Sequence, residues 1–290
     1  MGILLGLLTA LTWGGADFLA RFATRRIGTL RAMFYMQGIG FVLLTIFLPW
    51  LGGWGHLTDG SGWRPWAWGL LAGGISAFST LALYRAFEIG KMSVVAPLSA
   101  SYPALTLLLS RLSGEPLTGV RTAGIFCVLL GAIVVARGEK APDAGDTEAM
   151  NRSGAGIDWA ILAGIGFGFL FWLLGTQIVP RVGATQTVWM IRLTSAAVAA
   201  ILILAGRQPM RLPRDNTRWL VFTMGFLDTA AFILSNRSMQ MEHIAVVSVL
   251  GSLYGAVTVA FAAIFLRERI SRWQLAGIVT IFAGIFMISQ

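Results

Sequence analysis

Ten long apolar runs dominate this sequence, and they decide which solvent the chain can fold in. The runs follow one another along the 290 residues, and most of the connections between them are short. Each is close to the roughly 20 apolar residues that a helix needs to cross a bilayer. Charged residues make up only 12% of the chain, about half the share in an average soluble domain. A soluble fold of this size lacks the interior to hide so much apolar surface. The sequence therefore predicts an all-α polytopic membrane protein.

The predicted transmembrane helices fall into two groups of five. They are expected at residues 2–24, 32–51, 66–87, 92–112, 119–137, 158–179, 186–205, 219–238, 245–266 and 273–289. A hydrophilic stretch at 138–157, rich in Gly, Ala and acidic residues, separates the groups and has the composition of a flexible linker. The expected domains are thus a first five-helix repeat at 1–137, the linker at 138–157, and a second repeat at 158–290.

The two halves resemble each other at an offset of 152 residues. For example, Arg85 of the first half corresponds to Arg237 of the second (237 − 85 = 152). Other matches at this offset, or at 153 after one gap, are Tyr102 with Tyr254, Thr106 with Thr258, Glu115 with Glu268, Gly124 with Gly277, and Gly131 with Gly284. Because five is an odd number, the second copy must enter the membrane from the opposite side. Inverted repeats are the usual architecture of secondary transporters, whose site lies near the membrane midplane.

The loops carry an uneven distribution of positive charge, which predicts the orientation. Of the 22 Lys and Arg residues, sixteen fall on one predicted side and six on the other. The side richer in Lys and Arg is expected to be cytoplasmic. Both termini would then be non-cytoplasmic.

Short motifs in both halves resemble the drug/metabolite transporter superfamily, in its EamA type. The motifs are Leu11-Thr12-Trp13-Gly14-Gly15-Ala16-Asp17-Phe18, Ala96-Pro97-Leu98, Tyr102-Pro103 and Gly114-Glu115-Pro116-Leu117-Thr118 in the first half, and Leu250, Tyr254 and Arg267-Glu268-Arg269-Ile270-Ser271 in the second. The resemblance implies a transporter of amino acids, drugs, sugars, nucleotide sugars or other metabolites, and a place in the bacterial inner (plasma) membrane. Members of this family are often drawn with cytoplasmic termini, whereas the charge count here predicts the reverse.

Charged side chains inside predicted spans are candidate functional groups, because a charge in hydrocarbon costs at least about 2.5–3.5 kcal/mol. Asp228 either binds a cationic group or a proton, or forms a structural hydrogen bond. Asp17 either carries a proton or pairs with Arg21 at i+4. Arg192 either holds a substrate carboxylate or extends to the interface. Glu115 and Glu268 are expected to cap or pair at a helix end.

Aromatic and helix-breaking residues add further candidates. Trp13 and Trp172 occupy the first helix of each half, away from the span ends that interfacial tryptophans favour. Polar and helix-breaking residues cluster at corresponding places in the fourth and ninth spans, which points to a transport site; close packing is the alternative. The expected substrate- or proton-binding residues are Asp17, Asp228, Trp13, Tyr84, Ser99, Tyr102, Trp172, Arg192, Asn236 and Tyr254.

The sequence contains no Walker motif, no metal-ligand spacing and no nucleophile–base pair, so neither an enzyme nor a metal or cofactor is expected. The net charge of +9 resides in short loops and is interpreted as a topology signal rather than a nucleic-acid surface. The predicted function is secondary active export of small organic solutes, such as amino acids or related metabolites, by alternating access around a central cavity. The alternatives are a channel-like cation conduit and proton-coupled drug or cation efflux. The expected partners are the lipid bilayer, a small-molecule substrate and protons, and a monomer would suffice.

Overall fold

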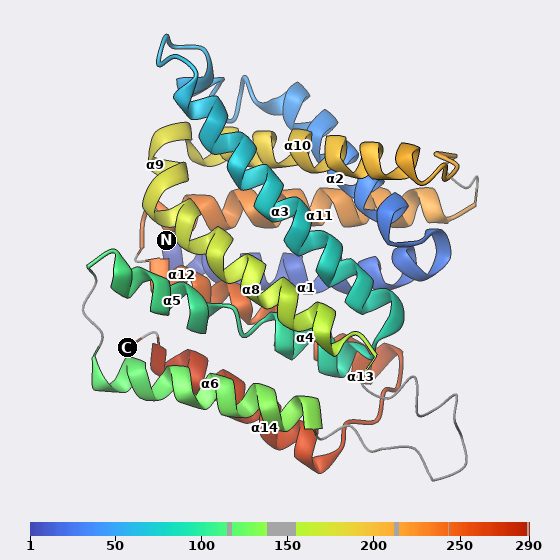
Figure 1. Cartoon of the computed structure of the whole chain (residues 1–290), viewed down its shortest axis with the longest axis vertical. Helices are drawn as coiled ribbons and strands as arrows, with labels where there is room; N and C mark the ends of the chain where they lie inside the picture. The colour runs from blue at the N-terminus through green and yellow to red at the C-terminus, as the bar shows by residue number, and fades with distance from the viewer. Residues whose placement is uncertain (115–117, 138–154, 212–214, 243, 289) are drawn as a thin grey trace.

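The computed structural model is a bundle of helices joined by loops (Figure 1). It describes residues 1–114, 118–137, 155–211, 215–242, 244–288 and 290. The first repeat contains α1 (Gly2–Ile27), α2 (Thr29–Phe47), a short 3-10 turn η1 (Gly55–Leu57), α3 (Arg64–Ile89), α4 (Met92–Ser99), α5 (Pro103–Leu112) and α6 (Gly119–Arg137). The second contains α8 (Ile157–Leu173), a π-helical turn η2 (Leu174–Ile178), α9 (Val179–Val182), α10 (Ala184–Ala205), α11 (Thr217–Met239), α12 (Ile244–Ser252), α13 (Tyr254–Phe265) and α14 (Arg272–Ile288).

The helices are long and apolar enough for a membrane. Within the described residues, eight segments qualify as spans, and two shorter apolar helices cover Gly119–Val135 and Arg272–Ile288. A 17-residue helix such as α14 is about 26 Å long, close to the roughly 30 Å of a bilayer's hydrocarbon core. Large apolar side chains such as Phe126 and Phe286 remain exposed on the outer faces, as expected where lipid is the solvent.

Each span of the two groups of five has its counterpart in the structure, with ends within four residues of those predicted. The fold is thus an all-α polytopic membrane protein of two inverted five-helix repeats, as predicted. The span expected at 158–179 continues through η2 to Val182. Most of the expected linker and Glu115 lie outside the described residues, so the domain boundaries stay predictions.

Two spans are discontinuous at corresponding places. The fourth breaks between Ser99 and Pro103, where Pro103 starts α5 without needing a backbone N–H. The ninth breaks at Leu253, between α12 and α13. Tyr102 and its counterpart Tyr254 lie at these breaks. Broken helices at matching positions of two repeats are typical of transport sites.

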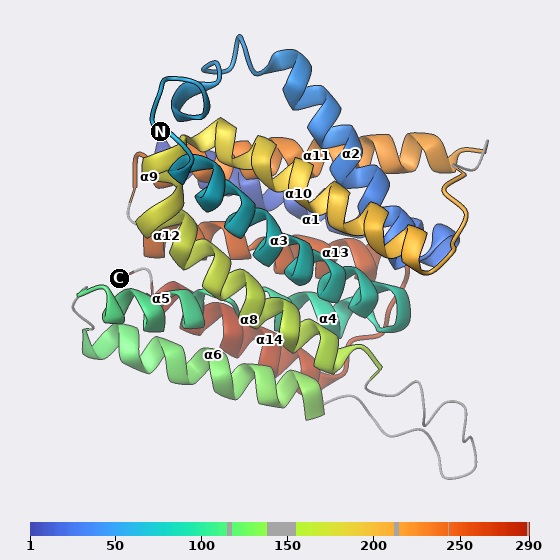
Figure 2. The same ribbon diagram turned by 45° about the horizontal axis from the view of Figure 1, so that its top comes forward.

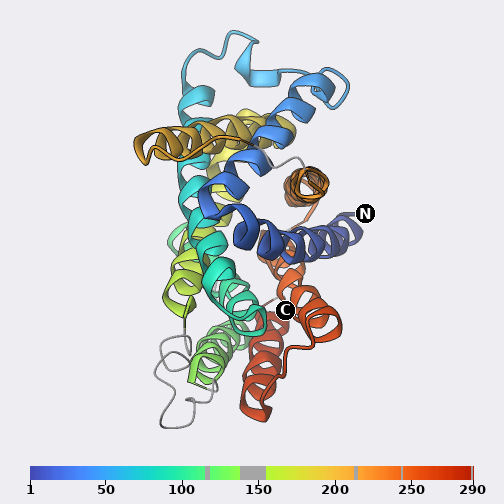
Figure 3. The same cartoon turned by 90° about the vertical axis from the view of Figure 1, so that its right-hand side faces the viewer.

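When two helices from different repeats pack together, their counterparts in the opposite repeats also pack together. Helix α1 of the first repeat packs on α11 of the second, and the corresponding α8 packs on α3. In the same way, α2 packs on α11 and α10 packs on α3. The side view shows the two repeats interleaved rather than separate (Figure 3). A site between α1, α3, α8 and α11 is therefore built equally from both halves.

The last helices of the two repeats, α6 and α14, lie side by side and antiparallel (Figure 1). A methyl group added to Gly131 would lie 2.7 Å from the carbonyl oxygen of Gly277. A methyl group on Gly284 would lie at the same distance, 2.7 Å, from the carbonyl oxygen of Gly124. Gly131 and Gly284 occupy corresponding positions of the two repeats, and so do Gly277 and Gly124. The two contacts are therefore equivalent. Only glycine allows backbones to approach so closely, as in small-residue contacts between membrane helices.

The ends of the bundle differ in charge. Both termini lie at the same end (Figure 1), as an even number of spans requires. The opposite end carries Arg25 and Arg26 in the last turn of α1, and the connections at Gly90 and at 266–271 (Figure 2). We call it the arginine-rich end, and the other the terminal end. Which end faces the cytoplasm remains a prediction from charge.

Candidate functional site

A cavity lies between the repeats, lined by α1, α3, α8, α11 and the two helix breaks. Its volume is about 30 Å³, roughly that of one water molecule and well below the roughly 300–1,000 Å³ of small-molecule sites, so the lining must move apart to admit an organic solute. No lining residue is more than 9% exposed, so the cavity is buried in the bundle. Asp228 lies at the middle of α11. The lining residues are Trp13, Asp17, Thr80, Leu83, Tyr84, Tyr102, Phe167, Phe171, Asp228, Phe232 and Tyr254.

Aromatic rings packed against one another form much of the cavity wall. Trp13 makes edge contacts with Phe171 and Phe232, at centroid distances of 5.6 and 5.1 Å. It also contacts Tyr254 at 6.2 Å, and Tyr102 stacks on Phe171 at 4.8 Å. Edge-to-face and offset pairs are favourable for aromatic rings. The wall is therefore held in place by its own contacts and presents both ring faces and ring edges.

The tyrosines at the two helix breaks bind across the repeats. The Tyr102 hydroxyl donates to the Ser248 carbonyl oxygen at 3.0 Å, and the Tyr254 hydroxyl donates to Ser99 Oγ at 3.0 Å. Each hydroxyl thus donates a hydrogen bond to the opposite repeat. These bonds satisfy polar groups that would be costly to bury alone, and they fix both aromatic rings at the cavity.

One carboxylate of the cavity already has a cationic partner. Asp228 Oδ2 lies 2.6 Å from Arg192 Nη2. Arg192, on α10, is fully buried behind the lining. Its Nη1 donates to Gln37 Oε1 on α2 at 2.6 Å, and its guanidinium carbon lies 5.0 Å from the centre of the Phe232 ring. Of the two sequence interpretations of Arg192, extension to the interface is therefore wrong for this conformation.

The second carboxylate, Asp17, has no ion pair or hydrogen bond among the described residues. It is only 5% exposed and lines the cavity. The alternative that Arg21 neutralises it is wrong, because Arg21 pairs with Glu268 instead, at 3.0 Å. The described part of the chain holds no group of three or more His, Cys, Asp and Glu side chains suited to a metal ion.

This geometry can be set beside known proteins. A model of the EamA-like transporter family matches residues 1–137 and 154–290, one match for each repeat. The chain belongs to the EamA-like transporter family. One solved crystal structure is similar to this transporter with a TM-score of 0.69, over 99% of this chain and 95% of that chain, at 17% sequence identity. That likeness concerns the fold alone. No curated protein matches the chain.

Most of the binding residues expected from the sequence meet in this EamA-like transporter. The cavity is lined by Trp13, Asp17, Tyr84, Tyr102, Asp228 and Tyr254. Ser99 and Arg192 lie one contact behind it, through Tyr254 and Asp228. Trp172 and Asn236 lie elsewhere: the Trp172 indole N–H donates to Ser113 Oγ at 3.0 Å, and Asn236 Nδ2 donates to the Ala184 carbonyl oxygen at 3.0 Å.

Several lining residues were not expected. Phe167, Phe171 and Phe232 resemble any other apolar residue of a span, so no sequence signal marks them. Gln37 did carry a signal, since it is a polar residue inside the apolar run of α2, and the structure makes it the second partner of Arg192.

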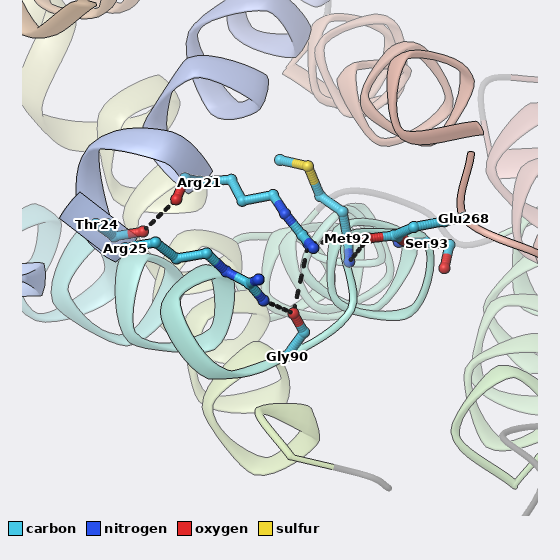
Figure 4. A network of polar contacts seen from close by, with 7 residues as sticks. All are labelled: Arg21, Thr24, Arg25, Gly90, Met92, Ser93 and Glu268. Carbon is cyan, nitrogen blue, oxygen red and sulfur yellow. Dashed lines mark hydrogen bonds and ion pairs between the residues drawn. The ribbon is translucent and has the colours of Figure 1, made fainter. Parts of the chain in front are cut away.

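At the arginine-rich end, a polar network joins the two repeats (Figure 4). Glu268, in the connection before α14, pairs with Arg21 of α1 and accepts from the backbone N–H groups of Met92 and Ser93, at 3.4 and 3.0 Å. These N–H groups belong to the first turn of α4, where a carboxylate is favoured. The Gly90 carbonyl oxygen accepts from Arg25 at 3.1 Å. The expected capping role of Glu268 is confirmed, and its cap lies on the other repeat.

At the terminal end, the loop that follows α2 binds the second repeat. Gln186 Nε2 donates to the carbonyl oxygens of Gly53 and Gly52, at 2.7 and 3.2 Å. The Leu51 carbonyl oxygen accepts from Arg237 Nη2 at 3.0 Å. Contacts between the repeats therefore exist at both ends of the bundle, with the cavity between them.

Proposed function

We propose that this EamA-like transporter is a secondary active exporter of small organic solutes, with amino acids or related metabolites as cargo, working by alternating access around the central cavity. The observation that carries the proposal is a buried cavity, built equally from both inverted repeats and lined by two carboxylates and an aromatic wall. Buried carboxylates in a membrane span are costly, and they usually mark a substrate, ion or proton pathway. A pair of inverted repeats supplies two related conformations, each opening the cavity toward one side.

The contacts at the two ends give this mechanism its parts. Opening toward the arginine-rich end requires Glu268 to leave Arg21 and the first turn of α4. Opening toward the terminal end requires Gln186 to leave the carbonyl groups of Gly52 and Gly53. Because each contact joins one repeat to the other, rocking of the repeats can break one set while keeping the other. Asp17 and Asp228 are the candidate groups for a coupling proton.

Reconstitution in liposomes tests the proposal. Purified protein should accelerate the movement of at least one compound from a panel of radiolabelled amino acids and amines, with saturation and with exchange against unlabelled compound inside. An imposed proton gradient should drive accumulation. If no compound moves faster than in protein-free liposomes under any gradient, the proposed function is wrong.

A channel-like cation conduit is the alternative, and the burial of the cavity between two sets of contacts disfavours it. A conduit would give flux without saturation and without counterflow. A carrier must return empty or loaded, so labelled solute outside should exchange with unlabelled solute inside. The same liposomes separate the two mechanisms.

A further inference from the structure

The charged residues around the cavity indicate which substrate charge it can accommodate. Asp17 and Asp228 are the charged members of the described lining. Arg192 lies behind Asp228 and forms an ion pair with it at 2.6 Å. With these three groups ionised, the site carries a net charge of one negative unit (−2 + 1 = −1). The uncompensated unit is on Asp17.

Arg192 is poorly placed to receive a substrate carboxylate. Its guanidinium is fully buried, with Nη2 on Asp228 and Nη1 on Gln37. One face also lies over the Phe232 ring. An anionic substrate would have to displace Asp228 from this arrangement, and would leave that carboxylate buried without a cation, which is strongly unfavourable. The cation next to the cavity, Arg192, is thus already paired with a carboxylate of the protein, Asp228.

The remaining lining suits a cation with an apolar body. Asp17 is a buried carboxylate without a partner among the described residues, so a ligand ammonium can form a charge-assisted hydrogen bond with it. Trp13 and Tyr254 lie in the same wall, and ring faces attract cations. The hydroxyl groups of Tyr102 and Tyr254 already donate hydrogen bonds to the protein, so the other hydroxyl donors of the lining are those of Tyr84 and Thr80.

We propose that the cavity selects organic monocations: amines with an apolar or aromatic body, whose ammonium group binds Asp17 and which need no free carboxylate. This inference rests on the proposed transport function and sharpens it. Among metabolites related to amino acids, it favours the amines that lack the carboxyl group over the amino acids themselves.

Three compounds that share a phenyl ring and a two-carbon spacer test the substrate class. They are 2-phenylethylamine (ammonium alone), phenylalanine (ammonium and carboxylate) and 3-phenylpropionate (carboxylate alone). Binding is measured by isothermal titration calorimetry on the full-length protein in detergent. We expect 2-phenylethylamine to bind tightest, phenylalanine about tenfold weaker or more, and 3-phenylpropionate not at all.

Variants at two aspartates assign the effect. Asp17→Asn keeps the shape and removes the charge, and should weaken 2-phenylethylamine about tenfold or more, as loss of a charge-assisted hydrogen bond does. Asp158→Asn, at the exposed start of α8, is the matched control and should leave binding unchanged. The ligand series on the unaltered protein keeps the test valid if Asp17→Asn fails to fold.

The outcomes separate this inference from the proposed function. Binding of phenylalanine or 3-phenylpropionate as tight as that of the amine overturns the substrate class, as does unchanged affinity in Asp17→Asn or no binding of any of the three. Flux of some other solute in liposomes would then still support a transporter. Absence of all flux would instead overturn the proposed function.

Discussion

Arg192 Nη2 and Asp228 Oδ2 lie 2.6 Å apart, and both belong to the second repeat. The pair joins neighbouring helices α10 and α11, while Gln37 ties it to α2 of the first repeat. A buried ion pair behaves as a unit, because removal of one partner leaves the other charge uncompensated.

Breaking this pair should destabilise the protein more than removing it. Asp228→Asn leaves the Arg192 guanidinium buried without its counter-charge, and should lower the free energy of unfolding by about 3–5 kcal/mol. The double variant Arg192→Met with Asp228→Leu removes both charges, and should recover much of that loss. Thermal unfolding of the purified protein in detergent measures both. Equal melting temperatures for Asp228→Asn and the unaltered protein would contradict the prediction.

Weakening the contacts at opposite ends should open the cavity to opposite sides. Glu268→Gln loses the ion pair with Arg21, and Gln186→Leu loses the hydrogen bonds to Gly52 and Gly53. The reporter is Thr80→Cys in the cavity, with Cys127→Ser removing the native thiol. Labelling by a membrane-impermeant maleimide should rise from the arginine-rich side in Glu268→Gln, and from the terminal side in Gln186→Leu.

A control at the arginine-rich end separates gating from loss of surface charge. Glu88 also pairs with an arginine, Arg85, at 2.7 Å, and accepts a hydrogen bond from Thr29 Oγ1 at 2.6 Å. Both partners belong to the same repeat as Glu88. Glu88→Gln should therefore leave labelling of the Thr80→Cys thiol unchanged from both sides. If Glu268→Gln and Gln186→Leu raised labelling from the same side, the assignment of the two end contacts would be wrong.

Two glycine substitutions should have opposite signs. Gly131→Ala places a methyl group 2.7 Å from the Gly277 carbonyl oxygen and forces α6 and α14 apart, at about 1–3 kcal/mol. Gly74→Ala, inside α3, meets no atom within 4 Å, and should stabilise by up to about 1 kcal/mol through helix propensity. Melting temperatures in detergent report both. A neutral Gly131→Ala would mean that the close contact does not matter for stability.

The orientation can be tested at both termini. The excess of Arg and Lys at one end predicts that this end is cytoplasmic. Protease-cleavable tags at residues 1 and 290 should then be cut from outside in intact cells. Cleavage of both tags only after lysis would reverse the orientation. Cleavage of one tag alone would contradict the even number of spans.

Sequence patterns predict the spans well here because each depends on its own composition. The breaks at Tyr102 and Leu253 were signalled too, by prolines in the fourth span and glycines in the ninth. Local patterns fail where partners come from different helices. Arg21 follows Asp17 by four residues, yet the way α1 lies in the bundle turns Arg21 toward Glu268.

The same limit applies to the cavity. Whether Trp13 or Trp172 faces the cavity depends on which face of α1 and of α8 is turned toward it. The sequence makes the two tryptophans equally plausible, but only Trp13 lines the cavity. The pairing of Arg192 with Asp228 likewise requires α10 and α11 to be neighbours at one depth. Composition identifies costly charges; packing decides which of them neutralise one another.

The glycine contact between α6 and α14 is self-complementary: each helix offers the other the surface that it receives. Interfaces of this kind join identical subunits into two-fold dimers, whose formation depends on how much protein is present. Here the two partners are parts of one chain. Their ratio is fixed at synthesis, and dilution in the membrane cannot separate them. A dimer of this kind would need two subunits inserted in opposite orientations. In this chain, the two repeats have opposite orientations in every molecule.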